Sequence, residues 1–293
     1  MSSHAVTLSL KQMLTSAFQE DMGFGDLTVD SILSDSDEAG VFIAKAPGVL
    51  AGLRSIRLGY QILDPAVSVN LLKTDADPVK PGDVIAEVEG PVSALLTGER
   101  VILNMIQHLS GIATATAGAV EAVGENGPRI CDTRKTLPGL RSLQKYAVRC
   151  GGGFNHRFRL DDGVMIKDNH IAAAGSIRAA VEAVRSRVGL MVRVEVECET
   201  REQVVEAVEA GADIIMLDNK SPEEVVALRR EIPPQILVEL SGGITTETVG
   251  RYRETGADYI SLGSLTHSVT ALDISFNLTR GDKFNLTRGD KAG

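Results

Sequence analysis

The amino-acid sequence predicts an α/β protein in which a mixed α+β unit of about 100 residues precedes a set of parallel strands. Three observations lead to this fold class. After Gly127-Pro128, short apolar runs alternate regularly with amphipathic segments. The last four runs end about 22 residues apart, a typical length for a strand and its crossover helix. Over residues 40–95, by contrast, short strands and turn sequences prevail.

The N-terminal unit is predicted to begin with a helix over residues 7–22. Leu10, Leu14 and Phe18 recur there at helical spacing, and two glycines directly after the segment end it. Thr28 is then predicted to cap a helix or to form a turn.

Further elements of this unit follow from the same kind of pattern. Residues 40–52 predict two short strands around a Pro-Gly turn, and residues 84–90 predict another strand. A helical segment is expected over 52–63. A long helix is predicted over 97–122, with a bend or break at Gly111.

The alternation after residue 127 predicts parallel strands with helical crossovers. We expect strands at 129–133, 164–166, 191–197, 212–218, 236–240 and 258–262. We expect helices at 138–150, with Pro138 in the first turn, and at 174–188, 201–210, 222–231 and 245–255. Six such strands fit either an open doubly wound sheet or most of a barrel. The uniform spacing and the lack of a Gly-x-Gly-x-x-Gly turn favour the barrel.

Composition restricts the class of partner. The 293 residues carry a formal net charge of −9, with 4% aromatic residues and no Trp, so no nucleic-acid partner is expected. No apolar run is long enough to cross a bilayer and no secretory signal is visible, so we expect no membrane partner. Cys131, Cys150 and Cys198 lack metal-like spacing, and we interpret them as reduced thiols of a cytoplasmic protein.

The C-terminal end contains a tandem repeat. Residues 276–283 recur unchanged as residues 284–291. Eight residues are too few to add a domain, so we interpret the repeat as a duplication at a poorly ordered end.

Residues 132–170 form a cationic stretch in this acidic chain. From Arg134 to Lys167 the stretch carries eight Lys or Arg residues and two Asp residues. Like charges that converge on one site destabilise it unless an anion binds between them. The sequence therefore predicts a small polyanion as the partner of this stretch.

The ligand site of a parallel α/β architecture lies at the carboxyl ends of its strands. Polar residues at those ends and in the adjoining loops are the candidates, namely Thr133, Arg134, Lys135, His156, Arg157, Lys167, Glu195, Glu197, Asp218, Ser241, Gly242, Gly243, Gly263 and Ser264. Arg and Lys suit carboxylates and phosphates, and glycine-rich turns offer backbone N–H groups to a phosphate. Glu197 and Asp218 suit Mg²⁺, directly or through water, or the hydroxyls of a sugar. Lys167 also suits a Schiff base with a carbonyl substrate, as in aldolases.

Several motifs together resemble the quinolinate phosphoribosyltransferase family, over roughly residues 8–275. In the cationic stretch the motifs are Thr133-Arg134-Lys135-Thr136, Pro138-Gly139-Leu140-Arg141, Lys145-Tyr146-Ala147-Val148, Gly151-Gly152-Gly153, Asn155-His156-Arg157 and Ile166-Lys167-Asp168-Asn169-His170. Outside it they are Glu20 to Thr28, Thr97-Gly98-Glu99-Arg100, Leu217-Asp218-Asn219, Ser241-Gly242-Gly243-Ile244 and Gly263 to Ser268. Leu137 and Leu240 depart from the expected Thr and Ala, but neither is a candidate site residue.

The resemblance implies an N-terminal α/β sandwich, an open and incomplete α/β barrel of the type II phosphoribosyltransferase kind, and a C-terminal return to the first domain. The sandwich would comprise residues 1–110 and 268–293, and the barrel residues 111–267. The resemblance also implies a homodimer, or a higher oligomer built from it, in which Arg100 reaches the neighbouring subunit's site.

The implied reaction is the Mg²⁺-dependent transfer of phosphoribosyl from phosphoribosyl pyrophosphate to quinolinate, with loss of CO₂. It would give nicotinate mononucleotide and pyrophosphate in NAD biosynthesis. Residues around the quinolinate carboxylates would be Arg134, His156, Arg157 and Lys167, with Arg100 from the other subunit. Residues for the phosphoribosyl part and Mg²⁺ would be Thr133, Lys135, Glu197, Asp218, Ser241, Gly242, Gly243, Leu262, Gly263 and Ser264. The expected catalytic residues are Lys135, Lys167, Glu197 and Asp218.

Other functions have to be weighed against this one. A related phosphoribosyltransferase could use nicotinate or another pyridine or purine-like acceptor, but the density of cations favours the two carboxylates of quinolinate. An aldolase would use Lys167, and borohydride would trap its adduct. A non-enzymatic binding module would leave the strand-end residues unexplained.

Overall fold

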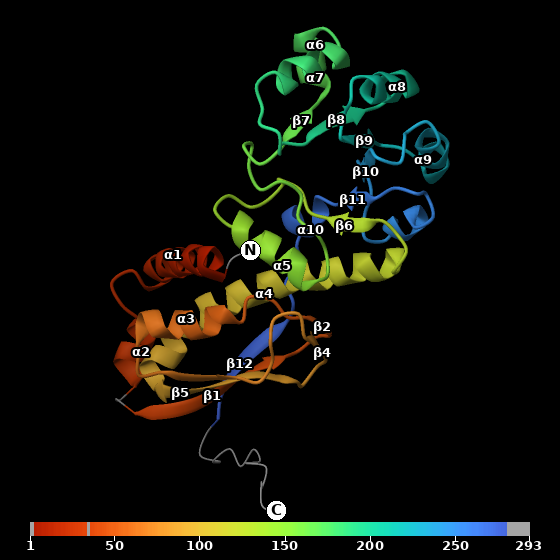
Figure 1. The fold of residues 1–293 in the computed structure, drawn as a ribbon. Coiled ribbons are helices and arrows are strands. Elements are labelled where there is room, and N and C mark those ends of the chain that lie inside the picture. Colours follow the sequence, from red (N-terminus) through yellow and green to blue (C-terminus); the bar gives the residue numbers. More distant parts are fainter. Residues whose placement is uncertain (1–2, 34–35, 280–293) are drawn as a thin grey trace, which may run out of the picture.

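The structure is a computed structural model that describes residues 3–33 and 36–279. Two bodies share one long helix, α4 (Val92–Val123), which runs between them (Figure 1). No helix among the described residues is long and apolar enough to span a membrane. The predicted C-terminal duplication lies outside the described residues, apart from the start of its first copy.

The N-terminal body contains a four-stranded antiparallel sheet. Its strand order is β12 (Ile274–Leu278), β1 (Asp37–Ala44), β5 (Val84–Pro91) and β3 (Ser68–Leu71). The helices that complete this body are α1 (Ser3–Met22), α2 (Leu27–Ile32) and α3 (Arg54–Leu63), beside a small sheet of β2 (Gly48–Val49) and β4 (Pro78–Val79). Its apolar core includes Phe18, Phe42, Tyr60 and residues of the first half of α4.

The second body is a six-stranded parallel sheet. Its order is β6 (Arg129–Cys131), β11 (Tyr259–Ser261), β10 (Leu237–Ser241), β9 (Ile214–Asp218), β8 (Val194–Cys198) and β7 (Val164–Ile166). The helices that follow these strands along the chain are α5 (Arg141–Cys150), α6 (Asp168–Ala174), α7 (Ile177–Arg185), α8 (Arg201–Glu209), α9 (Pro222–Arg229), the 3₁₀ helix η1 (Val249–Tyr252) and α10 (Ser264–His267).

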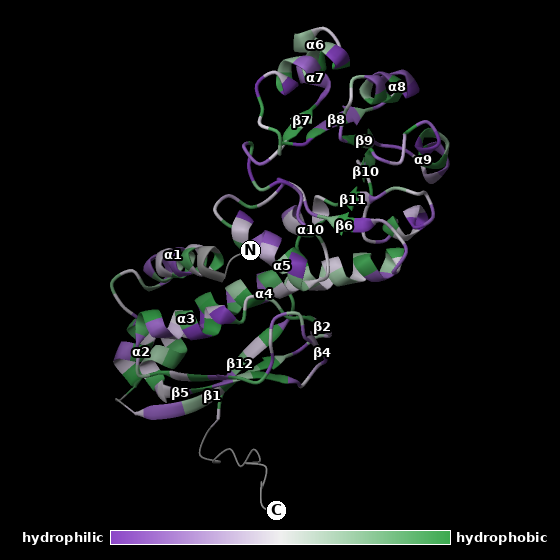
Figure 2. Cartoon of the chain, in the orientation of Figure 1, coloured by the Kyte–Doolittle hydropathy of each residue, from purple (hydrophilic) through white to green (hydrophobic). Residues whose placement is uncertain are grey.

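The edge strands β6 and β7 do not pair, so the barrel is open and incomplete. This confirms the predicted fold class and decides against a doubly wound sheet. The strands are mainly hydrophobic, whereas the surrounding helices carry both kinds of residue (Figure 2). The pattern is that of strands buried on both faces.

Two predictions for the N-terminal unit are wrong. Gly111 does not break α4, which continues to Val123. The glycine instead allows a close contact, since a Cβ atom built there would overlap the Thr270 carbonyl oxygen. Asp26, not Thr28, caps α2, since its carboxylate accepts hydrogen bonds from the amides of Thr28 and Val29.

Three further predictions fail in the barrel. Pro138 lies before α5, which begins only at Arg141. Residues 245–255 form a turn and the short 3₁₀ helix η1 rather than a full α-helix. The sequence reading also missed α6, which starts directly after Lys167. Each error concerns a segment that connects two strands, and none moves a strand.

Candidate active site

A cavity of about 610 Å³ opens at the carboxyl ends of the parallel strands. Most residues predicted for the site line it, namely Thr133, Arg134, Lys135, His156, Arg157, Lys167, Glu197, Asp218, Ser241, Gly242 and Gly243. Met165, Met216, Asn219, Glu239 and Ser261 complete its wall. We call this space the strand-end cavity. The structure thus brings the cationic stretch and the later acidic residues together.

Five predicted residues do not line the strand-end cavity, and one of them, Glu195, lines another cavity instead. Arg100 lies on α4 with its side chain 61% exposed, and its nearest acidic partner is Glu99, at 4.0 Å. Leu262 is buried. Gly263 lies behind Lys135, since a Cβ atom added to it would be 2.9 Å from Lys135 Cδ. Ser264 lines a separate cavity beside α4.

The strands present these residues through the alternation of side chains. Glu195 and Glu197 are two positions apart on β8, so both face the barrel interior, whereas Val194, Val196 and Cys198 are buried on the other face. Asp218 ends β9 in register with Ser241 at the end of β10. Neighbouring strands therefore deliver an acid and a hydroxyl to the same edge.

The turns at the strand ends require particular backbone conformations. Asn219 has a φ of 54°, and its Nδ2 donates a hydrogen bond of 2.6 Å to Asp218 Oδ2. Gly242 has a φ of 84°, and a Cβ atom there would lie 2.7 Å from Asp218 Oδ1. Only glycine allows this approach, which leaves the backbone of the turn open to a ligand.

Lys167 and Glu197 form an ion pair at the rim of the cavity, through Nζ and Oε2. Lys167 is the N-cap of α6, and its side chain is half-exposed. The Lys167 amine is thus engaged by a carboxylate, and a carbonyl substrate would have to displace Glu197 before it could form a Schiff base. This contact therefore disfavours the aldolase alternative.

A buried ion pair fixes the loop that carries His156. Asp132 Oδ1 and Lys145 Nζ are in contact with no exposed side-chain surface, and Lys145 also donates to the His156 carbonyl oxygen at 2.9 Å. Asp132 accepts from Asn155 Nδ2 at 2.6 Å and from the His156 amide at 2.9 Å. Burial raises the pKa of Asp132 and lowers that of Lys145, while each charge opposes the shift of the other.

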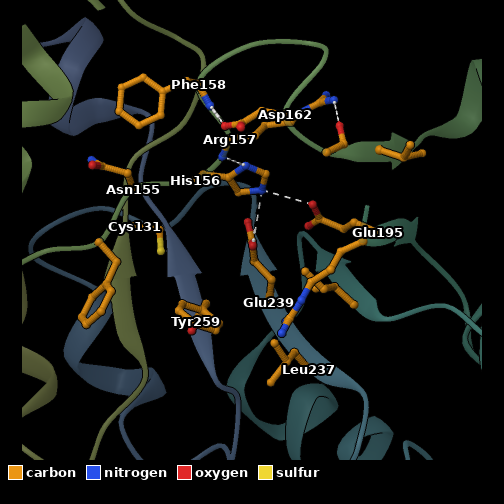
Figure 3. A pocket seen from close by; sticks show the side chains of 15 residues that line it. Cys131, Asn155, His156, Arg157, Phe158, Asp162, Glu195, Leu237, Glu239 and Tyr259 are labelled. Atoms are coloured by element: carbon orange, nitrogen blue, oxygen red, sulfur yellow. Dashed lines mark hydrogen bonds and ion pairs between the residues drawn. The ribbon is translucent and has the colours of Figure 1, made fainter. Parts of the chain in front are cut away.

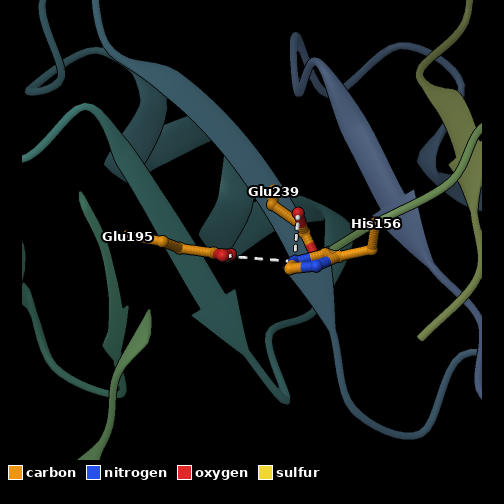
Figure 4. A group of neighbouring side chains, drawn as sticks. All are labelled: His156, Glu195 and Glu239. Atoms are coloured by element: carbon orange, nitrogen blue, oxygen red, sulfur yellow. Dashed lines mark hydrogen bonds and ion pairs between the residues drawn. The ribbon is translucent and has the colours of Figure 1, made fainter. Parts of the chain in front are cut away.

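His156 lies between two buried carboxylates (Figure 4). Its Nε2 is 3.1 Å from Glu195 Oε2 and 3.5 Å from Glu239 Oε2. Burial and then the charge of Glu195 raise the pKa of Glu239 to about 8. Burial lowers the pKa of His156, but the Glu195 hydrogen bond and the charge of Glu239 outweigh it, so the net shift is upward. We call these three residues the acid–imidazole cluster.

The acid–imidazole cluster has the composition of a metal site, with ligand atoms within 4.8 Å of one another. Its hydrogen bonds argue otherwise. His156 Nδ1 accepts from the Arg157 amide at 2.7 Å, so the ring hydrogen of neutral His156 is assigned to Nε2. This hydrogen points at the carboxylates and occupies the position that a metal ion would need.

A second cavity, of about 420 Å³, lies on the other side of the cluster (Figure 3). His156, Arg157 and Glu239 line both cavities, so these residues form the wall between them. The second cavity is lined by the first residues of the strands, such as Val164, Ile214, Leu237 and Tyr259, and by Phe154 and Phe158.

Sequence reasoning missed Glu239, Asp132 and the role of Lys145. The available signal was an ionisable residue within an otherwise apolar strand, as in Leu237-Val238-Glu239-Leu240. Such residues are rarely buried without a partner. The described cysteines are unpaired, as predicted, and burial raises the pKa of both Cys150 and Cys198 to about 12, which makes them poor nucleophiles.

Comparison with known proteins gives consistent matches. Models for the N-terminal and C-terminal domains of quinolinate phosphoribosyl transferase match residues 26–110 and 112–277. A probable nicotinate-nucleotide pyrophosphorylase [carboxylating] from Bacillus subtilis is 53% identical over 272 residues, covering 93% of this chain and 94% of that protein. The nicotinate-nucleotide pyrophosphorylase [carboxylating] of Rattus norvegicus is 41% identical over 278 residues, covering 92% and 91%.

Solved structures agree with these sequences. NadC from Streptococcus pyogenes superposes with a TM-score of 0.89 at 43% identity, covering 93% of this chain and 97% of that chain. Human nicotinic acid phosphoribosyltransferase, at 14% identity and a TM-score of 0.57, shares the fold alone. With both domain models matched along most of its length, the chain belongs to the quinolinate phosphoribosyl transferase family.

Proposed function

We propose that this protein transfers the phosphoribosyl group of phosphoribosyl pyrophosphate to quinolinate and releases CO₂, giving nicotinate mononucleotide and pyrophosphate for NAD biosynthesis. One observation carries the proposal. Arg134, Lys135, Arg157 and Lys167 converge on the strand-end cavity, where Glu197 and Asp218 stand among them. The similarity of the chain to nicotinate-nucleotide pyrophosphorylases [carboxylating] supports the proposal.

The cations divide between two anionic substrates. Arg134, Arg157 and Lys167, with His156, bind the two carboxylates of quinolinate. Lys135 and the turn at residues 241–243 bind the phosphoribosyl part, because glycine allows backbone N–H groups to approach a phosphate. A dicarboxylate uses this density of positive charge better than nicotinate, which has one carboxylate.

Glu197 and Asp218 fit Mg²⁺ as the cofactor. Both supply hard oxygen ligands, and a hydrogen bond is found for only one oxygen of each carboxylate over residues 3–33 and 36–279. Two protein carboxylates suit an ion that keeps water and substrate oxygens as its other ligands. Mg²⁺ would stabilise the negative charge on the departing pyrophosphate.

The chemistry needs no protein nucleophile. The ring nitrogen of quinolinate forms a bond to ribose C1 as the bond from C1 to pyrophosphate breaks. Arg134 and Arg157 hold the pyridine ring at the distance that this step requires. Loss of CO₂ then leaves an electron pair on the ring carbon beside the cationic nitrogen. A proton then bonds to this carbon in place of the lost carboxyl group. The fixed cations stabilise each negative charge without reorganising.

We further infer a homodimer in which Arg100 completes the partner's site. In one subunit Arg100 is exposed and away from the strand-end cavity, so it is available to another chain. Phe24, Leu27 and Ile32 are also exposed on this body, and such apolar residues suit a subunit contact. We place the enzyme in the cytoplasm, which agrees with its unpaired cysteines.

The direct test is to incubate the protein with quinolinate, phosphoribosyl pyrophosphate and Mg²⁺ and to measure nicotinate mononucleotide and CO₂. We expect both products in equal amounts, and their loss when EDTA removes Mg²⁺. Nicotinate in place of quinolinate should give at most slow turnover. Turnover of nicotinate without CO₂ release at a higher rate would reassign the acceptor.

Variants of the cationic residues make the test specific. We expect Arg134→Ala and Lys167→Ala to lower kcat/KM by a factor of 10³ or more, on the order of 4 kcal/mol, while the dimer persists. Arg230→Ala, an exposed arginine outside the strand-end cavity, is the matched control. Near-normal CO₂ release by either cavity variant would contradict the assignment.

A further inference from the structure

We propose that Glu239 sets the charge of the wall of the strand-end cavity beside His156, and that Glu239 takes up a proton when a dicarboxylate binds in this cavity. The inference rests on the proposed function for the identity of the ligand. It concerns a residue that neither the sequence reading nor the proposed mechanism used.

Glu239 lies in the wall of the strand-end cavity. Glu239 is on β10, two residues before Ser241, and it lines the strand-end cavity although the residue is only 4% exposed. Its Oε1 accepts a hydrogen bond from Ser261 Oγ. Its Oε2 faces His156 Nε2. The Glu195 carboxylate, on β8, approaches the same nitrogen (Figure 4).

The acid–imidazole cluster has too few hydrogen-bond donors for its two carboxylates. One Nε2–H group serves two carboxylates, because His156 Nδ1 accepts a hydrogen bond from the Arg157 amide and therefore offers no second donor. Glu195 Oε1 is buried and has no hydrogen-bond partner among the described residues. Two ionised carboxylates with one neutral imidazole are costly to bury, so a proton on Glu239, which leaves the hydrogen bond from the Arg157 amide to His156 Nδ1 intact, stabilises the cluster.

The other groups around Glu239 do not remove the need for a proton on the cluster. Glu195 on β8, His156 in its loop, Ser261 on β11 and the Asp132 carboxylate beyond β6 all act on Glu239. Asp132 is paired with Lys145, and the charges of Cys131 and Glu239 oppose each other's ionisation. Burial and the Glu195 charge raise the pKa of Glu239, which agrees with the geometry.

Protonation of the cluster is expected to be coupled to the binding of a ligand. His156 and Glu239 share the cavity wall with Arg134, Arg157 and Lys167, so a bound dianion would lie close to the cluster. Added negative charge raises the proton affinity of nearby groups. Binding should therefore draw a proton from solvent at a pH where the cluster is only partly protonated, and the protonated wall should in turn favour a second carboxylate.

Calorimetry can measure this uptake directly. Quinolinate would be titrated into the protein without phosphoribosyl pyrophosphate, in buffers of different ionisation enthalpy, at pH 8 and at pH 6.5. We expect uptake of up to about one proton at pH 8 and clearly less at pH 6.5, where the cluster already holds its proton. Glu239→Gln should lose the extra uptake at pH 8, and Glu239→Asp, which keeps an ionisable group, should regain part of it.

Two measurements separate this proposal from the proposed function. Glu254→Gln, at a glutamate whose side chain is 88% exposed and faces Arg253, should take up protons like the wild type. Without any ligand, ¹⁵N NMR of histidine should show His156 with its hydrogen on Nε2, and Glu239→Gln should lower the pH at which that ring titrates. No heat of quinolinate binding would refute the proposed substrate. Binding with equal uptake in wild type and Glu239→Gln, or an unchanged His156 titration, would overturn the role of Glu239.

Discussion

At the scale of single residues, the site depends on ionisable groups that the barrel buries. Asp132 and Lys145 have no exposed side-chain surface, yet together they hold the backbone on both sides of His156. A buried pair of this kind contributes little net stability compared with apolar residues, but losing one partner leaves an uncompensated charge. Such a pair is better explained by its role in positioning the loop.

Asp132→Asn should therefore destabilise the protein by about 3–5 kcal/mol, because Lys145 would remain buried without its counter-charge. Denaturant unfolding measures this loss. The double variant Asp132→Asn with Lys145→Met should recover much of the stability, but it should not restore activity if the pair positions His156. Equal destabilisation by the single and the double variant would contradict the ion-pair explanation.

Glu239 should also make stability depend on pH. Its folded pKa lies above its unfolded value, so the stability it contributes is complete below the unfolded pKa and is lost as pH rises through about 8. The stability of the wild type should thus fall relative to Glu239→Gln between about pH 5 and pH 8. Parallel chemical denaturation at several pH values gives the comparison, with exposed Glu254→Gln as the control. A constant difference across this range would be contrary to the expectation.

At the scale of elements, the alternation of short apolar runs with amphipathic segments was enough to locate all six strands of the barrel. The ends of those strands then gave the site, because residues such as Glu197 and Asp218 follow directly from strand register. Loops were less predictable. Pro138 and residues 245–255 carry ordinary helix signals, but tertiary contacts decide where those helices begin and whether they form. Glu239 was missed because nothing in a single strand shows which neighbours its carboxylate meets.

Helix α4 offers a matched test of tertiary packing against helix propensity. Gly111→Ala should destabilise the protein although alanine favours helices by about 1 kcal/mol, because the new methyl group would meet the Thr270 carbonyl. Gly118→Ala lies in the same helix with no atom within 4 Å of the new methyl group, and it should stabilise the protein or leave it unchanged. Thermal unfolding of both variants decides the matter. A more stable Gly111→Ala protein would show that the close contact with the Thr270 carbonyl does not outweigh the helix propensity of alanine.

At the scale of the whole molecule, the prediction that Arg100 acts in the partner's site can be tested by mixing subunits. Arg100→Ala and Lys167→Ala homodimers should each be inactive. If Arg100 acts in trans, half of the randomly exchanged dimers would be mixed, and each of these would have one intact site, so about one quarter of the wild-type activity should return. Renaturing an equimolar mixture and assaying CO₂ release measures this. Mixing without any recovery would contradict a shared site.

The pairing of β12 with β1 has a consequence for biosynthesis. These strands join residues 274–278 to residues 40–44, so the first sheet lacks an edge strand until residues 274–278 have been synthesised. On the ribosome, the barrel can complete its hydrogen bonds before the body that precedes it in the sequence. Until β12 emerges, β1 presents an unpaired edge that another nascent chain can join. Truncation from the 3′ end of the coding sequence should therefore yield an insoluble product even when every catalytic residue is retained.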